Sequence, residues 1–291
     1  MPYGYRTDLA MESLEMSRRA CEKADALPGV RSAERTIEGF PVTSVEILND
    51  EGANRLGKPT GVYHTLLLDA LMRREEDAFP RACLALRQLV RPLLPAPDGA
   101  ALIIGLGNRQ ITPDAIGPRT ADYVIATRHL TAQVPDFFAD WRPVSALAPG
   151  VLGQTGVEAQ EIVSAVVQAV KPAVVVAVDA LAAGSMKRLC RTVQLTDAGI
   201  VPGSGVQNAR AALNRDTLGV PVLALGVPTV VDGASLAAEL GQPAAAEWKS
   251  FLVTTRDIDR EAADLSRLLG YALNLALQPD LELEDIDLYL A

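Results

Sequence analysis

Histidine and cysteine are scarce in this chain. Its 291 residues include two histidines, His64 and His129, and three cysteines, Cys21, Cys83 and Cys190. The cysteines are scattered and odd in number, which argues against a disulfide framework or zinc ribbon and for a reducing compartment. Neither histidine lies in an HExxH or HxxEH pattern, and no P-loop is present. The commonest metalloprotease and nucleotide-binding motifs are therefore excluded.

A basic surface and a long apolar segment are also missing. The net charge is −9 and no long basic run occurs, so the sequence disfavours direct nucleic-acid binding. The longest apolar stretch, "PAVVVAVDALAAG", is interrupted by Asp179 and is too short to span a membrane. The N-terminal "MPYGYRTDLAMESLEMSRR" is polar, unlike a signal peptide. We therefore expect a cytoplasmic protein with no membrane partner.

Hydrophobic residues make up 49% of the chain and aromatic residues only 4%, a composition typical of α/β proteins. The apolar patterns predict a mostly parallel sheet flanked by helices, with a small N-terminal β/α appendage. Strands are predicted at 41–48, 62–69, 101–106, 143–147, 173–178, 192–196 and 221–226. Helices are predicted at 7–25 (with Thr7 as N-cap), 75–93, 114–128, 157–170, 180–188, 232–240 and 257–277.

The loop "GLGNRQITPDAIGP" (105–118) follows a predicted strand, as a dinucleotide-binding loop would. Gln110 stands where the third glycine of that fingerprint belongs, so a nucleotide is not expected. The loop instead carries Asp114 beyond one strand end, and Asp179 closes the apolar run of another. Functional side chains gather at such strand ends in open parallel sheets.

Each aspartate has an alternative interpretation as a helix cap, which suits Asp114 beside Pro113 well. Two acids at equivalent strand ends favour a functional pair. Carboxylates held close together share a proton and can act as an acid and a base, or they can bind a metal. His129 at a helix end and Ser204 in "PGSGVQN" are weaker candidates, and Ser204 is interpreted as part of a tight loop lining a cleft.

Several longer blocks extend these motifs in a fixed order. They are "RTDLAMES", "PVTSVEIL", "GLGNRQITPDAIGP", "TRHL", "RPVSALAPGVLGQTG", "VVAVDALAAGS", "DAGIVPGSGVQN" and "TLGVPVLALGVPTVVD". Together they resemble the germination proteases, spore endopeptidases that degrade small acid-soluble spore proteins. The resemblance implies a fold like that of the hydrogenase maturation proteases (phosphorylase/hydrolase-like), and a homotetramer made as a zymogen in the forespore and kept in the spore core.

The resemblance also implies site residues. The family's two catalytic aspartates match Asp114 and Asp179, and the loop that shapes the site matches Gly105, Gly107 and Asn108. The "TDLA" at 7–10 resembles the family's self-processing site, with the cut expected between Asp8 and Leu9. Residues 1–8 would then form a short propeptide, and residues 9–291 a single α/β protease domain.

Two departures from the family pattern keep other functions open. The region 233–256 is shorter than in the family, and Gly184 stands where the family carries arginine. One alternative is a metal-dependent maturation-type protease, which needs a third ligand. Another is a catalytically silent paralogue that only binds spore proteins. The leading hypothesis is an endopeptidase with an aspartate pair and no cofactor, although a divalent metal is not excluded.

Overall fold

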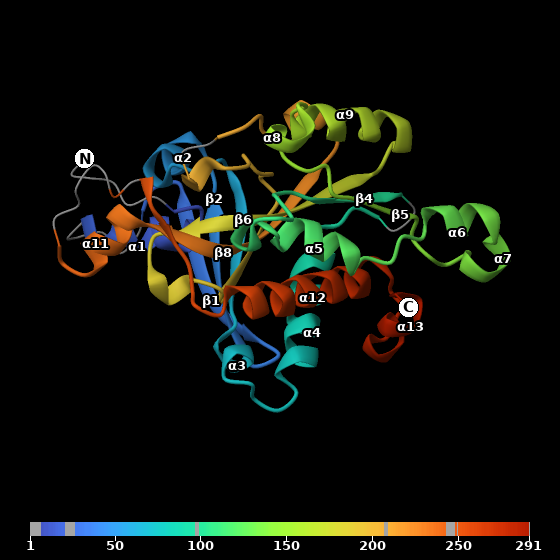
Figure 1. The fold of residues 1–291 in the computed structure, drawn as a ribbon, viewed down its shortest axis with the longest axis horizontal. Helices are drawn as coiled ribbons and strands as arrows, with labels where there is room; N and C mark the ends of the chain where they lie inside the picture. Colours follow the sequence, from blue (N-terminus) through green and yellow to red (C-terminus); the bar gives the residue numbers. More distant parts are fainter. Residues whose placement is uncertain are drawn as a thin grey trace.

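The computed structural model describes residues 7–20, 27–96, 99–206, 209–242, 248 and 250–290. Within them, a single mixed sheet forms the centre of the molecule (Figure 1). Its strands run in the order β1-β2-β3-β7-β8-β6-β4-β5, and β9 pairs with β8. The strands are β1 (Val30–Ile37), β2 (Phe40–Ile47), β3 (Gly61–Leu67), β4 (Ala101–Gly105), β5 (Val144–Leu147), β6 (Val174–Ala183), β7 (Thr192–Thr196), β8 (Val222–Asp232) and β9 (Leu252–Val253).

The sheet has a parallel half and an antiparallel half. Strands β5, β4, β6 and β8 pair in parallel. The residues of β4, β6 and β8 are almost all buried because helices cover both faces. Every other pairing is antiparallel. The predicted α/β fold is confirmed, but parallel pairing is confined to these four strands. The N-terminal strands extend the same sheet through β7.

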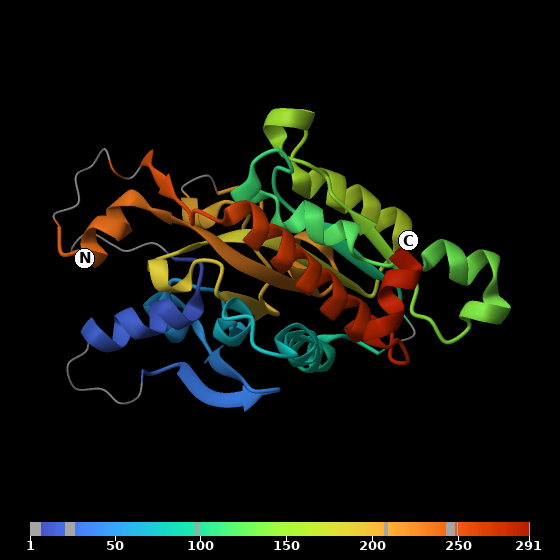
Figure 2. The ribbon, with the colours of Figure 1, turned by 60° about the horizontal axis from the view of Figure 1, so that its bottom comes forward.

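Helices pack on both faces of the sheet. On one face, α4, α5 and α12 bury a large apolar cluster, and α12 runs along the sheet (Figures 1 and 2). On the other face, α9 covers β4 and β6, and α1 and α2 cover β2 and β3. The helices are α1 (Ala10–Ala20), α2 (Asp50–Leu56), α3 (Asp69–Met72), α4 (Ala78–Val90), α5 (Ile116–Asp122), α6 (Arg128–Gln133), α7 (Pro135–Phe138), α8 (Leu152–Thr155), α9 (Ala159–Val170), α10 (Arg215–Leu218), α11 (Gly233–Glu239), α12 (Ile258–Leu277) and α13 (Ile286–Leu290).

Three local predictions are wrong. The segment 180–188 is not a helix, because β6 continues to Ala183 and pairs with β8 to its end. Strand β1 was not predicted, because it is an exposed edge strand without an apolar alternation. Helix α1 begins at Ala10, so Thr7 is not its N-cap, and residues 21–26 of the predicted helix lie outside the described part. No described helix has the length and apolar character needed to cross a membrane.

Candidate active site

A cleft of about 1620 Å³ opens on the face of the sheet that carries α1, α2 and α9. Its floor comes from β6, β7 and β8, and its walls come from the loop after β4, the α1–α2 side and the loop 199–205. Asp114 and Asp179 both line it, as do Gly107 and Asn108. The structure therefore brings the two predicted acids together in one cleft.

The position of Asp179 follows from the strand register. Asp179 of β6 pairs with Gly226 of β8, and Gly226 pairs with Gln194 of β7, so the three residues form a row across one face of the sheet. Strand β4 pairs with β6 only as far as Val178. Asp179 thus lies at the first position of β6 beyond the end of β4, where the cleft opens.

The loop after β4 holds Asp114 by backbone contacts. Gly107 has φ +112°, and a Cβ there would lie 2.1 Å from the carbonyl oxygen of Asp114, so only glycine fits. The amide of Asn108 donates a hydrogen bond to Asp114 Oδ2 at 2.7 Å. Thr229 Oγ1 of β8 donates to the carbonyl of Pro113 at 2.7 Å and anchors the short 3-10 helix η2 (Thr112–Asp114) to the sheet.

Gly105 does not line the cleft, and it affects the loop that carries Asp114 through its packing against α5. A Cβ at Gly105 would lie 2.2 Å from the carbonyl oxygen of Gly117, and a Cβ at Gly117 would lie 2.2 Å from that of Leu106. The two glycines let the start of α5 press directly against β4. This close contact sets the path of the loop that carries Asp114.

Burial dominates the electrostatics of the two acids. Asp179 is 6% exposed, and its pKa is raised well above the usual range, first by burial and then by the negative charge of Asp114. The amide of Ala180 donates to Asp179 Oδ1 at 2.9 Å and opposes this shift. Asp114 is half-buried, and burial raises its pKa against the opposing bond from Asn108. The arrangement favours a proton on Asp179.

The raised pKa of Asp179 predicts a pH-dependent stability. The folded protein holds this proton more tightly than the unfolded chain, so ionising Asp179 costs stability as the pH rises above about 4. We expect Asp179→Asn to raise the melting temperature at pH 7, with a gain of about 1.4 kcal/mol for each unit of the shift. The gain should disappear as the pH falls towards 4.

Thermal unfolding at pH 4 and pH 7 measures this effect. Asp136→Asn, an exposed aspartate on α7, is the matched control and should change little at either pH. An equal loss of stability at both pH values in Asp179→Asn would mean that folding does not raise the pKa of Asp179, and a larger loss at pH 7 than at pH 4 would mean that the native carboxylate is favourably bound.

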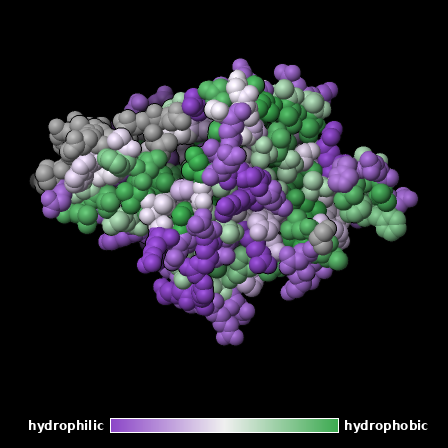
Figure 3. Space-filling view, viewed as in Figure 1, coloured by the Kyte–Doolittle hydropathy of each residue, from purple (hydrophilic) through white to green (hydrophobic). Residues whose placement is uncertain are grey.

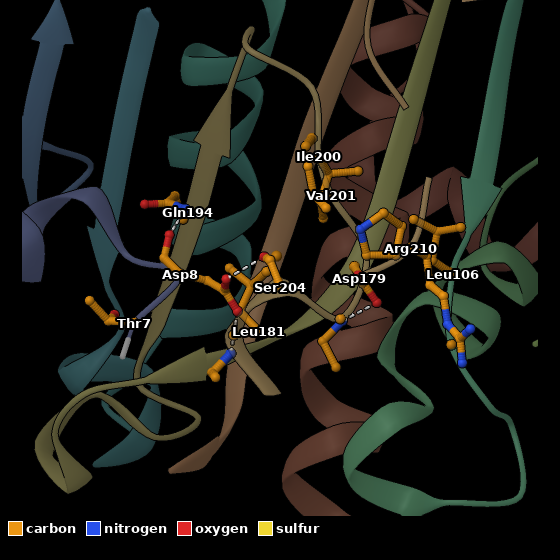
Figure 4. Close-up of a pocket in the computed structure, with 18 of the residues that line it drawn as sticks. Thr7, Asp8, Leu106, Asp179, Leu181, Gln194, Ile200, Val201, Ser204 and Arg210 are labelled. Atoms are coloured by element: carbon orange, nitrogen blue, oxygen red, sulfur yellow. Dashed lines mark hydrogen bonds between the residues drawn. The ribbon is translucent and has the colours of Figure 1, made fainter. Parts of the chain in front are cut away.

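The predicted self-processing segment lies in the same cleft. Asp8 binds β6 through its backbone, donating to the carbonyl of Ala182 at 2.9 Å. Its carboxylate accepts bonds from the amide of Ala182 at 2.8 Å and from Ser204 Oγ at 2.9 Å (Figure 4). Leu9 is completely buried in a cluster with Leu181, Leu189 and Val231. The negative charge of Asp8 also contributes to the raised pKa of Asp179.

Two charged residues, the half-buried Lys58 and the buried Glu12, hold this segment in place. Lys58 Nζ donates to the carbonyl of Thr7 at 2.8 Å, and burial lowers the pKa of Lys58. Glu12 accepts hydrogen bonds from the amide of Gly184, at 2.7 Å, and from Thr7 Oγ1. Burial raises the pKa of Glu12. The segment is therefore integrated into the wall of the cleft.

The other sequence candidates lie elsewhere. His64 on β3 pairs with Ser44 and does not line the cleft, and His129 lies in the first turn of α6, where the helix dipole does not favour a cation. Cys83 and Cys190 are buried, and burial raises the pKa of Cys83 to about 12. Cys21 lies outside the described residues. No group of three or more His, Cys, Asp or Glu suited to a metal occurs in the described part of the chain.

Gln194 and Lys58 were not predicted from the sequence. In "TVQLT", the residues Thr192, Gln194 and Thr196 alternate with apolar ones, and all five are buried. Three polar side chains on one face of a buried strand indicate a polar cleft on that face, which is the signal that could have identified Gln194. Lys58 follows a loop glycine and carries no comparable pattern.

Comparisons with known proteins agree with the ordered motifs of the sequence. A family model described as "Germination protease" matches residues 8–241, which include Asp8 and both cleft aspartates. The chain belongs to the germination protease family. A germination protease of Clostridium perfringens (strain ATCC 13124) is 38% identical over 325 aligned residues, covering 99% of each chain.

Other members of the germination protease family are similarly related. The germination protease of Caldanaerobacter subterraneus subsp. tengcongensis is 37% identical, covering 96% of this chain and 95% of its own. That of Priestia megaterium is 40% identical over 81% of this chain and 66% of its own. The [NiFe] hydrogenase maturation protease HycI from Thermococcus kodakarensis matches with a TM-score of 0.37 and 19% identity, covering 64% of this chain and 98% of that one. The family assignment rests on the sequence relatives.

Proposed function

We propose that this chain is an endopeptidase of spore germination that cleaves small acid-soluble spore proteins, with Asp114 and Asp179 as its catalytic acids. The observation that carries the proposal is the cleft itself. It holds a pair of carboxylates of unequal burial and, beside them, Thr7 and Asp8 of the chain's own TDLA segment, which is hydrogen-bonded to β6. Family membership supports the protease activity and its place in spore germination.

The unequal environments of the acids suggest how hydrolysis proceeds. Asp114, half-exposed and bonded to the amide of Asn108, serves as the ionised base that takes a proton from water. Asp179, more deeply buried, serves as the acid that donates its proton as the peptide C–N bond breaks. The oxygen of water thus becomes the second oxygen of the new carboxyl group, and the proton from Asp179 goes to the leaving amine.

The substrate would bind as an extended strand. Spore proteins released from DNA are disordered, and a disordered chain can add to an open sheet edge. Such an edge exists on β6 beyond Val178, where β4 has ended and Asp8 bonds to Ala182. No membrane or nucleic-acid partner is part of the proposal.

Assembly as a homotetramer is part of the proposal. Exposed apolar side chains gather around α11 and β9 (Figure 3), where Leu240 and Phe251 are each 61% exposed and Leu252 is 52% exposed. Apolar patches of this kind mark protein–protein contacts.

Self-processing tests the proposed function directly. After incubation in mildly acidic, dehydrating buffer, we expect the purified chain to lose residues 1–8 and begin at Leu9. The Asp179→Asn variant should still begin at Met1, because its cleft lacks the proton donor. Intact mass and N-terminal sequencing measure both outcomes. A parallel incubation with a chelator tests the metal-dependent alternative, which requires activity to vanish and to return with a divalent ion.

An unprocessed wild-type chain would count against the zymogen part of the proposal. Spore proteins added in trans would then decide between a protease and a silent paralogue. Binding without any peptide product favours the paralogue, and new peptide termini favour the protease.

A further inference from the structure

The carboxylate of Asp8 accepts one hydrogen bond on each of its two oxygens. Ser204 Oγ donates to one oxygen at 2.9 Å, and the amide of Ala182 donates to the other at 2.8 Å. Gly205 leaves room for the acid, because a Cβ there would lie 2.2 Å from Asp8 Oδ2. The half-buried Lys58 lies close enough for its pKa to respond to the charge of Asp8. A pocket of this kind favours a carboxylate over an amide, because the charge of the carboxylate strengthens both hydrogen bonds and attracts Lys58, whereas a neutral amide forms only weaker bonds with Ser204 and the Ala182 amide.

Gln194 fixes the backbone on both sides of the next residue. Its Nε2 donates to the carbonyl of Asp8 at 2.9 Å, and its Oε1 accepts from the amide of Ala10 at 2.7 Å. The side chain between these bonds, Leu9, is fully buried. Gln194 thus holds the carbonyl of the peptide bond expected to be cut, in the same row of the sheet as Asp179.

These contacts are suited to a peptide that can exchange with another. The segment Thr7–Leu9 precedes α1, is joined to the body by side-chain and backbone hydrogen bonds, and occupies the β6 edge that β4 leaves open. A second chain with an acid followed by an aliphatic residue has the groups needed to make the same bonds.

We infer that Ser204, Gly205 and the Ala182 amide form the pocket that binds the acidic residue of a substrate. We also infer that Gln194 positions the peptide bond on the C-terminal side of this acidic residue. This inference rests on the proposed function and identifies residues that select where the protease cuts. Ser204 and Gly205 set specificity, whereas Gln194 is a positioning residue. In the full-length chain, the Thr7–Leu9 segment competes with substrate for the same contacts.

Peptide binding tests the inference without any need for cleavage. The probe is a fluorescent peptide with this chain's own sequence 5–14, and its partner peptide carries Asn in place of the aspartate. The parent protein is the full-length Asp8→Ala/Leu9→Ala variant, in which both anchors of the resident segment are removed. Fluorescence anisotropy should show tighter binding to this parent than to the wild-type chain, with a preference of about tenfold for the Asp peptide over the Asn peptide.

Three further substitutions, each made in this parent variant, test the contacts of the peptide one at a time. Ser204→Ala should weaken binding of the Asp peptide about tenfold and binding of the Asn peptide less, because a hydrogen bond to a charged acceptor is stronger than one to a neutral amide. Gly205→Ala should remove the preference, because its methyl group fills the space of the carboxylate and its φ needs no positive value. Gln194→Met should weaken both peptides alike. Thr131→Ala on α6, which does not line the cleft and whose hydroxyl bonds only within its own helix turn, is the matched control.

The outcomes distinguish the inference from the proposed function. Equal binding of the Asp and Asn peptides to the parent, or unchanged binding in Ser204→Ala and Gly205→Ala, would overturn the inference, as would no detectable binding. If the chain cleaves spore proteins but shows no such binding pattern, the proposed function stands and the assignment of the acid pocket is wrong. If the chain shows the full binding pattern but never cleaves, the pocket assignment stands and the proposed function is wrong.

Discussion

Replacing Asp179 or Asp114 by asparagine should lower the rate of peptide cleavage at least about a thousandfold, the range expected for loss of an acid–base group. Asparagine keeps the size of the side chain but cannot exchange a proton. The two single variants and the double variant should be similarly inactive, because the acids act on the same step. Initial rates of spore-protein cleavage, followed by mass spectrometry, measure the effect.

The same pair predicts a pH dependence for the wild-type rate. Cleavage requires one proton on the pair, so activity should fall in acid as Asp114 becomes protonated and fall again in base as Asp179 ionises. Because burial and the charge of Asp114 raise the pKa of Asp179, the basic limb should lie well above the usual pKa of an aspartate. Asp136→Asn serves as the control and should retain the wild-type profile. If Asp114→Asn and Asp179→Asn both cleave normally, the assignment is wrong.

Gly107→Ala should have the second largest effect, acting through the position of Asp114. The residue has φ +112°, and an added Cβ would lie 2.1 Å from the Asp114 carbonyl oxygen and 3.0 Å from Asp114 Oδ1. The loop must therefore move, and the strain should cost about 3 kcal/mol of stability. A displacement of Asp114 by about 1 Å should also lower the cleavage rate about a hundredfold.

Gly219→Ala provides a matched control for this substitution. Gly219 follows α10 outside the cleft and has φ +73°, but no atom lies within 4 Å of a Cβ there, so the variant has the backbone strain of a positive φ without the clash. We expect it to cost about 1 kcal/mol of stability and to leave the cleavage rate unchanged. Urea unfolding and cleavage rates of the two variants, measured side by side, separate loop displacement from a general effect of losing a glycine. Wild-type activity in Gly107→Ala would show that the loop does not position the acid.

Much of the fold was predictable because its signals are local. Strand β4 is short, apolar and ends at a glycine, and α12 has apolar residues at helical spacing in its first half and almost continuously in its second half. Both were predicted close to their observed bounds. The prediction of a helix at 180–188 was wrong because apolar residues such as those of Ala180–Ala183 suit a helix or a strand equally well. Only its pairing with β8 decides between them.

Some residues of the candidate site were also predictable from the sequence, and their contacts were not. Asp114 and Asp179 were identified from the sequence because a carboxylate next to a buried strand is costly to place without a reason. Asp8 was identified only through its resemblance to a processing motif. Neither route indicated that Asp8 bonds to Ala182 and Ser204, which are 174 and 196 residues away along the chain.

The sequence by itself determined the α/β class, most strand and helix positions, the family and the two acids, because each depends on residues that are neighbours along the chain. The tertiary structure decided which half of the sheet is parallel, how far β6 extends, and that Asp8, Asp179 and Gln194 share one cleft. These features depend on strand register and on the packing of segments far apart in sequence. A local pattern carries no information about them, because the free energy that fixes them comes from contacts formed only when the sheet is complete.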